Sequence, residues 1–321
     1  MQQAVYFIGC GHALLNLQRA GIALRLEMQQ CMLEQTRQLR QGLEAHGAGA
    51  ACQRMRQRDR IVGNGFAGLL QPLLQHLAQR PGRNLHVSLA TSQTEVLEAQ
   101  KLRYRVFADE MGARLTTRTP GVDRDLYDAF CEHLIVRDED AGRIVGTYRI
   151  LSPSAAREVG NYYSETEFDL TRLRHLKSRM VEIGRSCIDA DYRSGAVITL
   201  LWSGLARYML ENKYDYLIGC ASVSMADGGH TAASLYNRLK DEHLCPLEYR
   251  VFPRTPLPLQ ALRQDIEADT PPLIKGYLRA GAWICGEPAW DPDFNTADLP
   301  VLLPVSRLDA RYAKHFMGRK D

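Results

Sequence analysis

The stretch VEIGRSCIDADYRSG, residues 181–195, places an acid and a base inside an apolar, β-prone run. Glu182 is a carboxylate whose pKa would rise on burial, and such a group can take up a proton near neutrality. Arg185 is a planar cation that can pair with a carboxylate. An ion pair between the two residues that only joins strands remains the simpler alternative.

A β-bulge would reconcile these two charges with one strand. Side chains alternate along a flat strand, so Glu182 and Arg185 would otherwise point to opposite faces. Gly184 lies between them and favours a bulge, which inserts a residue and would turn Arg185 towards the face of Glu182. We therefore expect a bulge at Gly184 and an open slot between splayed strands, where an extended ligand arm could bind.

The residues after this strand are suited to an anionic ligand. Arg193, Ser194, Gly195 and Ala196 lead into a helix-like run. The first backbone N–H groups of a helix are unpaired, and the helix dipole favours anions there. Arg193 could add a charge-assisted contact. The turn therefore predicts a site for the phosphate of a phosphopantetheine or pyrophosphate group, although an ordinary helix start would look the same.

The elements that position these residues alternate between strands and helices. Hydrophobic spacing and turn signals predict a mixed α/β domain, because strands and helices follow one another along the chain. We expect strands at 86–90, 180–188 and 214–224, a hairpin at 131–151, and helices at 91–112, 196–212 and 227–243. The tail at 271–304 reads as loop-rich, with two short β runs.

The first part of the chain differs in composition from the rest. Residues 1–83 contain ten arginines, no lysine and four acidic residues, whereas the whole chain carries a net charge of only +3. We expect a basic, mostly helical or loosely ordered extension at 1–83 and a catalytic domain at 84–321. Such an extension suits an anionic partner such as a membrane surface. A nucleic-acid partner is not expected, because no aromatic residues are interspersed with the cluster RMRQRDR.

Composition also excludes several classes of protein. No apolar run reaches the length of a membrane span, and no secretory signal is evident, so we expect a cytoplasmic protein, with peripheral contact to the inner membrane as an option. The eight cysteines are scattered without a C-x-x-C pair. A zinc site or a disulfide framework is therefore not expected, and we expect no metal.

Several motifs resemble known acyltransferases of the GCN5-related N-acyltransferase superfamily. KLRYRVFADEMG, DRDLYDAF, GRIVGTYRIL and VEIGRS resemble acyl-homoserine-lactone synthases. A fuller set is similar to the ornithine acyl-ACP N-acyltransferases: VEIGRSCIDADYRSG, LLWSGLARYML, YLIGCASV, PPLIKGYLRAGAW and DPDFNTADL. The resemblance spans roughly residues 85–316. It implies a mixed central sheet with a bulged and splayed strand pair and helices on both faces.

The resemblance also implies an activity. Enzymes of this family transfer a 3-hydroxyacyl chain from acyl carrier protein to the α-amino group of L-ornithine, which makes lyso-ornithine lipid. No cofactor would be bound permanently, because the donor is the acyl-phosphopantetheine of acyl carrier protein. The alternatives are a related enzyme with another amino acid acceptor, an acyl-homoserine-lactone synthase, or a non-catalytic module that binds acyl carrier protein or lipid.

The same resemblance makes Glu182 the leading general base, which would take a proton from the α-ammonium group of the acceptor. Arg185 would bind a substrate carboxylate or support Glu182.

Other residues receive roles as well. Arg103 and Arg149 would bind the carboxylate of the amino acid or the phosphate of the carrier, and Asp123 and Asp128 would recognise a cationic side chain. Phe107 would line the acyl channel. The simpler alternatives are surface or strand-edge salt bridges for the arginines, a solvated loop for the aspartates and core packing for Phe107. A backbone N–H near Ser186 would stabilise the oxyanion formed from the thioester carbonyl.

Overall fold

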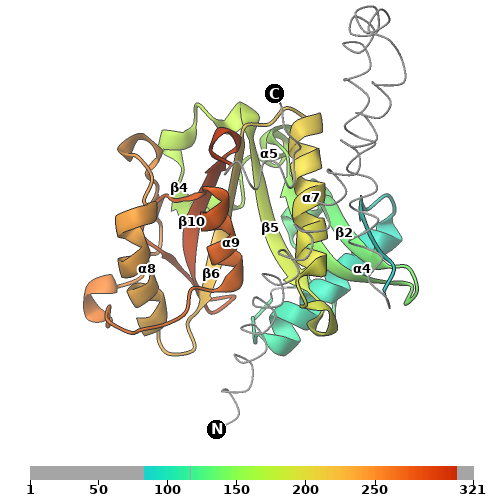
Figure 1. Ribbon diagram of the computed structural model, residues 1–321, viewed down its shortest axis with the longest axis horizontal. Coiled ribbons are helices and arrows are strands. Elements are labelled where there is room, and N and C mark those ends of the chain that lie inside the picture. Colours follow the sequence, from blue (N-terminus) through green and yellow to red (C-terminus); the bar gives the residue numbers. More distant parts are fainter. Residues whose placement is uncertain (1–82, 116, 309–321) are drawn as a thin grey trace, which may run out of the picture. The chain divides into compact units, whose positions relative to one another are not determined.

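The computed structural model describes residues 83–115 and 117–308, so the extension expected at 1–83 lies, apart from Arg83, outside the described residues. One mixed sheet dominates this part of the chain (Figure 1), in the strand order β1-β2-β3-β5-β6-β10-β8, with β9 paired to β10. The strands are β1 Leu85–Leu89, β2 Glu132–Asp138, β3 Arg143–Leu151, β5 Met180–Ile188, β6 Tyr216–Ser224, β8 Trp283–Ile284, β9 Ala289–Asp291 and β10 Thr296–Pro304. A second sheet pairs β4 Phe168–Asp169 with β7 Phe252–Pro253.

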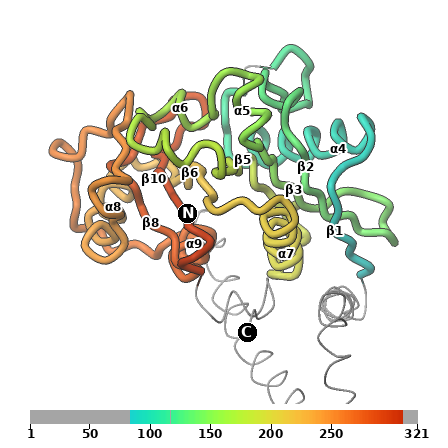
Figure 2. Tube along the Cα trace, turned by 90° about the horizontal axis from the view of Figure 1, so that it is seen from above, coloured from blue at the N-terminus to red at the C-terminus, as the bar shows by residue number. Residues whose placement is uncertain are grey.

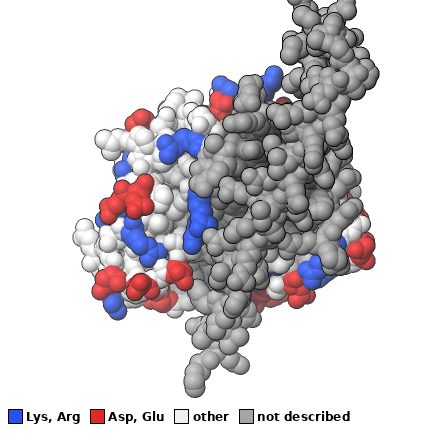
Figure 3. Space-filling model, viewed as in Figure 1, with Lys and Arg blue, Asp and Glu red and all other residues white. Residues whose placement is uncertain are grey.

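Helices cover both faces of the main sheet, as predicted. Figure 2 shows α7 and α9 on one side of it and α4 and α5 on the other. The helices are α4 Gln93–Tyr104, α5 Pro153–Val159, α6 Ser164–Glu167, α7 Ala196–Glu211, α8 His230–His243 and α9 Pro272–Ala280. None of them is long and apolar enough to cross a bilayer. Around α8, acidic and basic side chains are intermixed on the visible described surface (Figure 3).

The strands and helices that flank the Glu182 motif follow the sequence prediction closely. β5 and α7 begin at the predicted residues, and β2 and β3 form the predicted hairpin. The turn of this hairpin is held by Asp138, whose Oδ1 accepts the backbone N–H groups of Asp140 and Ala141 at 3.1 and 3.0 Å. These elements are predictable because apolar spacing and turn chemistry agree locally.

The tail departs from the prediction. It contains helix α9 and the nine-residue strand β10, all of whose residues are buried. β10 pairs with β6 along its whole length and with β8 and β9 on its other side. Pro300 and Asp298 interrupt the apolar pattern that marks a buried strand, so a prediction from residue types splits β10 into shorter pieces.

The predicted bulge is present one residue later than expected. Arg149 pairs with Gly184 and Thr147 pairs with Cys187, so Tyr148 alone faces both Arg185 and Ser186. Arg185 takes the left-handed backbone conformation, with φ 50°. The bulge therefore uses a charged residue, where the prediction relied on the conformational freedom of glycine.

The strand pair beyond the bulge is splayed. β5 and β6 run parallel and pair only at 180–182 with 216–218, after which no further pair joins them among the described residues. Gly219 lies at the point of separation, where an added Cβ would stand 2.5 Å from the carbonyl oxygen of Ile183. The close approach of two backbones at Gly219 therefore sets where the slot opens.

We expect Gly219→Ala to destabilise the domain, because the backbone oxygen of Ile183 cannot move aside as a flexible side chain would. Overpacking of this kind costs about 1–3 kcal/mol. Gly184→Ala is the matched control in the neighbouring strand, since an added Cβ there meets nothing within 4 Å. Thermal unfolding of both variants checks this, and equal melting temperatures would contradict it.

Candidate active site

A cavity of about 1130 Å³, counting the space at its mouth, lies where β5 and β6 separate. Five of the predicted site residues line this cavity: Phe107, Arg149, Glu182, Arg185 and Ser186. The bulge is the reason that Glu182 and Arg185 share a cavity, because three positions apart on a regular strand they would face opposite ways. The sequence therefore pointed to residues that come together at one cavity of the fold.

Glu182 is buried and bonded to the start of helix α6. Its Oε2 accepts the backbone N–H of Tyr163 at 2.6 Å, and its Oε1 accepts the backbone N–H of Ser164 at 2.6 Å and the Ser164 hydroxyl. Burial raises the pKa of Glu182 above its ordinary value, although the donors from Ser164 and Tyr163 act in the opposite direction. The carboxyl therefore combines fixed geometry with increased basicity.

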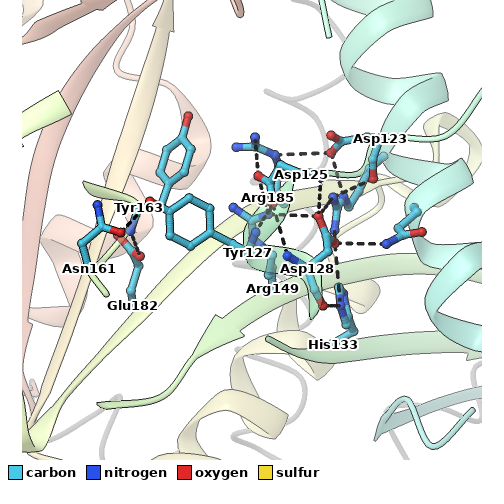
Figure 4. A network of polar contacts seen from close by, with 12 residues as sticks. Asp123, Asp125, Tyr127, Asp128, His133, Arg149, Asn161, Tyr163, Glu182 and Arg185 are labelled. Atoms are coloured by element: carbon cyan, nitrogen blue, oxygen red, sulfur yellow. Dashed lines mark hydrogen bonds and ion pairs between the residues drawn. The ribbon is translucent and has the colours of Figure 1, made fainter. Parts of the chain in front are cut away.

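The alternative of an ion pair between Glu182 and Arg185 is not what the structure contains. Arg185 pairs instead with two aspartates, with Nε 3.3 Å from Asp123 Oδ2 and Nη2 3.2 Å from Asp125 Oδ2. Its guanidinium carbon also lies 5.0 Å from the ring centre of Tyr163 and 4.5 Å from that of Phe294. Figure 4 shows the rings of Tyr163 and Tyr127 between Glu182 and this arginine.

Arg103 anchors the acidic loop that carries Asp123 and Asp128 from inside the domain. Its side chain is fully buried, with Nε 2.7 Å from Asp123 Oδ2 and Nη1 2.6 Å from Asp128 Oδ1. Burial alone would raise the pKa of Asp128, but the charges of Arg103 and Arg149 hold it far below its usual range. Arg103, Asp123 and Asp128 were predicted to contact substrate. They do not line the cavity and lie behind its wall, where they hold the residues that do.

Arg149 connects this buried cluster to the cavity. Its Nη1 lies 2.6 Å from Asp125 Oδ1 and 3.2 Å from Asp128 Oδ2, and its side chain is 5% exposed. Asp125 therefore holds Arg149 and Arg185 side by side. Two arginines at one wall of the cavity, each held by an aspartate, present fixed N–H donors, and such donors suit a carboxylate.

A second cavity, of about 850 Å³ with its mouth, is almost entirely apolar. It lies between α7, β6 and β10, and it meets the first cavity at Ile183, Cys220 and Tyr277, which line both. Its other walls include Trp202, Leu205, Ala206, Met209, Leu217, Val301 and Leu303. Phe107 does not belong to it; Phe107 lines the polar cavity and packs edge-to-face against Phe294 at 5.7 Å.

The predicted phosphate turn lies at the start of α7. Gly195, with φ 99°, precedes the first helical residue, Ala196, and no side chain caps the helix. Arg193 is half-exposed and lies 2.5 Å from Glu110, while its Nε donates to the backbone oxygen of Ile188. None of the four residues from Arg193 to Ala196 lines either cavity. A phosphate at this turn would have to replace Glu110 as the partner of Arg193.

Sequence reasoning missed several residues of the cavity. Tyr163 and Ser164 come from a segment that carried no motif, and they hold Glu182 through local backbone bonds that no residue pattern reveals. Tyr277 lies in the quoted stretch PPLIKGYLRAGAW, and its hydroxyl is 2.7 Å from that of Tyr148. Asp291 and Asp298 lie in DPDFNTADL. Tyr277, Asp291 and Asp298 lie in motifs that the sequence analysis singled out. Their approach to β5 depends on the tertiary fold and cannot be predicted from those motifs.

Comparisons with known proteins agree with this geometry. A family described as an acetyltransferase (GNAT) domain matches residues 102–203. Over 254 residues the chain is 36% identical to the L-ornithine N(alpha)-acyltransferase of Agrobacterium fabrum (strain C58), which covers 74% of this chain and 86% of that protein. It is 34% identical over 249 residues to the same-named protein of Brucella abortus (strain 2308), with 73% and 89% covered.

Among solved structures, the AHL synthase LasI aligns with 74% of this chain and 96% of its own, at 17% identity and a TM-score of 0.45. The level of identity and the coverage of the ornithine acyltransferases confirm the resemblance that the motifs indicated. The chain is an acyltransferase with a GNAT-type domain, and it belongs to the L-ornithine N(alpha)-acyltransferase family.

Proposed function

We propose that this enzyme transfers a 3-hydroxyacyl chain from acyl carrier protein to the α-amino group of L-ornithine, which yields lyso-ornithine lipid. The names of relatives that match over most of their length support the acceptor. The observation that carries the proposal is the junction of two cavities, one polar with a buried carboxylate and one apolar, at the splay of β5 and β6. An amino acid and an acyl chain would meet there.

Glu182 acts in this proposal as the general base. The α-ammonium group of ornithine must lose a proton before its nitrogen attacks the carbonyl carbon of the thioester, and a carboxylate of raised pKa can accept that proton. The tetrahedral intermediate then collapses, the C–S bond breaks, and the phosphopantetheine thiolate leaves and takes up a proton. The product is an amide, so no covalent enzyme intermediate is required.

The residues around Glu182 would position the reactants. Arg185, which lines the cavity beside Arg149, would bind the α-carboxylate of the acceptor. Among the described residues, β6 does not pair with β5 beyond Glu182, so backbone N–H groups near Ser186 would stabilise the oxyanion. Asp123 and Asp128 would act only by holding these arginines, since they lie behind the wall.

The donor is proposed to be acyl carrier protein, with its single phosphate at the turn from Arg193 to Ala196. The unpaired N–H groups at the start of α7 support this placement. We also propose that the protein is cytoplasmic and that residues 1–83, rich in arginine, contact anionic lipid at the inner membrane, near which the product would be released.

A panel of acceptors tests the activity directly. Purified protein is incubated with 3-hydroxyacyl-acyl carrier protein and single amino acids, including ornithine, lysine, glutamine and glycine, and products are read by mass spectrometry. We expect N-acylornithine as the main product, and slower transfer from the matching acyl-coenzyme A. Acylation of another amino acid in preference to ornithine would establish a related acyltransferase, and no product at all would falsify the enzymatic proposal.

The proton chemistry of Glu182 predicts a shift in pH profile. Ser164→Ala removes a hydrogen bond that stabilises the charged carboxylate, so the pKa of Glu182 rises further. We expect the acidic limb of kcat/KM to move to higher pH in this variant, while the plateau is kept. Glu182→Gln should lose about 100-fold or more of kcat at all pH values, as expected when a general base is removed.

The control for this prediction is Thr166→Ala, because the Thr166 hydroxyl donates to the Tyr163 carbonyl and makes no bond to Glu182. Its pH profile should match the wild type. A profile for Ser164→Ala that coincides with the wild type would show that Glu182 does not set the acidic limb.

The apolar cavity is proposed to hold the acyl chain, since its walls are almost entirely apolar and it shares Ile183, Cys220 and Tyr277 with the polar cavity. Ala206→Phe places a bulky ring inside it. We expect transfer of long acyl chains to decrease while short chains remain substrates, measured as kcat/KM for a series of acyl carrier proteins. Ala156→Phe, in a buried core position outside this cavity, separates the effect from general overpacking. An equal loss for all chain lengths would contradict the assignment.

A further inference from the structure

Two carboxyl groups and a thiol approach one another at the end of the polar cavity, away from the arginines. A ligand atom of Glu167, Cys220 and Asp298 each lies within 4.8 Å of the other two. Asp298 comes from β10 and lines the cavity, whereas Glu167, at the end of α6, lies behind it. Asp298 is 4% exposed, and its Oδ1 has no hydrogen-bond partner.

A neighbouring hydroxyl is also left without a partner. Thr296 lines the same end of the cavity, is 3% exposed, and its Oγ1 makes no hydrogen bond. Unpaired polar atoms in buried positions are rare, because each costs free energy unless something binds it. Thr296 adds a polar atom that is not part of a carboxyl group, and its hydroxyl lies near enough to Asp298 to lower the pKa of that carboxyl.

Negative charge at this end of the cavity is not balanced by the side chains around it. Asp291 on β9 and Glu182 on β5 add further carboxyl groups, and Cys220 on β6 adds a neutral thiol. Among the described residues that line the cavity, only Arg149 and Arg185 are cationic, and both are paired with Asp125 or Asp123. Burial raises the pKa of Glu167 and of Asp298, and their proximity raises that of Glu167 further.

Two carboxyl groups in such contact must either share a proton or bind a cation. The cavity places this pair close to Glu182, because the Ser164 hydroxyl bonds to Glu182 and lies 3.6 Å from the sulfur of Cys220, which in turn contacts the pair. A molecule with an amino group at Glu182 and a second cationic group a short alkyl chain away would reach both.

We propose that Asp298, supported by Glu167 and assisted by Thr296, binds the side-chain ammonium group of the acceptor and so makes the enzyme specific for a short diamino acid. This inference rests on the proposed function of the cavity. It moves recognition of the cationic side chain from Asp123 and Asp128, which are saturated by arginine, to carboxyl groups that are not.

Norvaline has the carbon chain of ornithine without the side-chain ammonium group. It therefore distinguishes a loss of the acyltransferase activity from a loss of the specificity site at Asp298. We expect Asp298→Asn to lower kcat/KM for ornithine by about 10- to 100-fold, as a lost hydrogen bond to a charged group does. Its activity on norvaline should be unchanged or improved, because norvaline has no ammonium group to pair with Asp298 and the amide of asparagine is easier to bury without a partner. Asp293→Asn, an exposed neighbour, serves as the matched control and should leave both activities unchanged.

A wild-type enzyme that acylates neither amino acid would refute the proposed function. Acylation of ornithine by the wild type together with an equal loss for ornithine and norvaline in Asp298→Asn would refute only the specificity site. The melting temperature of Asp298→Asn should be equal to or above that of the wild type, and ornithine should raise the melting temperature of the wild type but not of the variant.

The pH dependence gives a second readout. Protons on the carboxyl pair compete with the ammonium group, so the ratio of KM for ornithine to KM for norvaline should decrease as pH rises. This ratio should not vary with pH in Asp298→Asn. A metal ion is the competing ligand for these atoms. Stoichiometric metal in the purified protein, with activity lost to a chelator and restored by that metal, would overturn the proposal.

Discussion

The buried pairing of Arg103 with Asp123 and Asp128 is the constraint on which the site depends. A guanidinium group removed from water is tolerated only when every N–H finds an acceptor, and here helix α4 supplies the cation while the loop before β2 supplies the acceptors. That loop then presents Asp125 to Arg149 and Arg185. Removing one partner would leave an uncompensated charge and release the cavity wall as a unit.

The junction of two unlike cavities follows from the same sheet. β5 and β6 pair for three residues and then separate, and Gly219 fixes the point where they do so. On one side of the junction the walls are apolar and on the other they are charged, with Ile183, Cys220 and Tyr277 common to both. The separation of the two strands therefore places an apolar cavity beside a polar one.

Much of this arrangement could be predicted from the sequence, and the failures have identifiable causes. The run around Glu182 carried its own local signals, so the strand, the bulge and the helix after it were predictable. Arg103 and Asp123 were predicted to contact substrate, but both are buried and pair with each other, which residue types alone do not reveal. The full length of β10 was not predicted, because Pro300 and Asp298 interrupt its apolar pattern. The strand is stabilised by its pairing with β6, which the sequence of β10 does not show. Tyr163 and Ser164 act through their backbone, which residue types do not report.

The left-handed backbone of Arg185 has an evolutionary consequence. Side chains other than glycine are strained in this conformation, so the ion pairs of Arg185 with Asp123 and Asp125 must offset that strain. Glycine at this position would relieve the strain but would leave these two carboxylates with one cation fewer. A substitution of Arg185 is therefore tolerated only together with changes in the loop that carries the two aspartates.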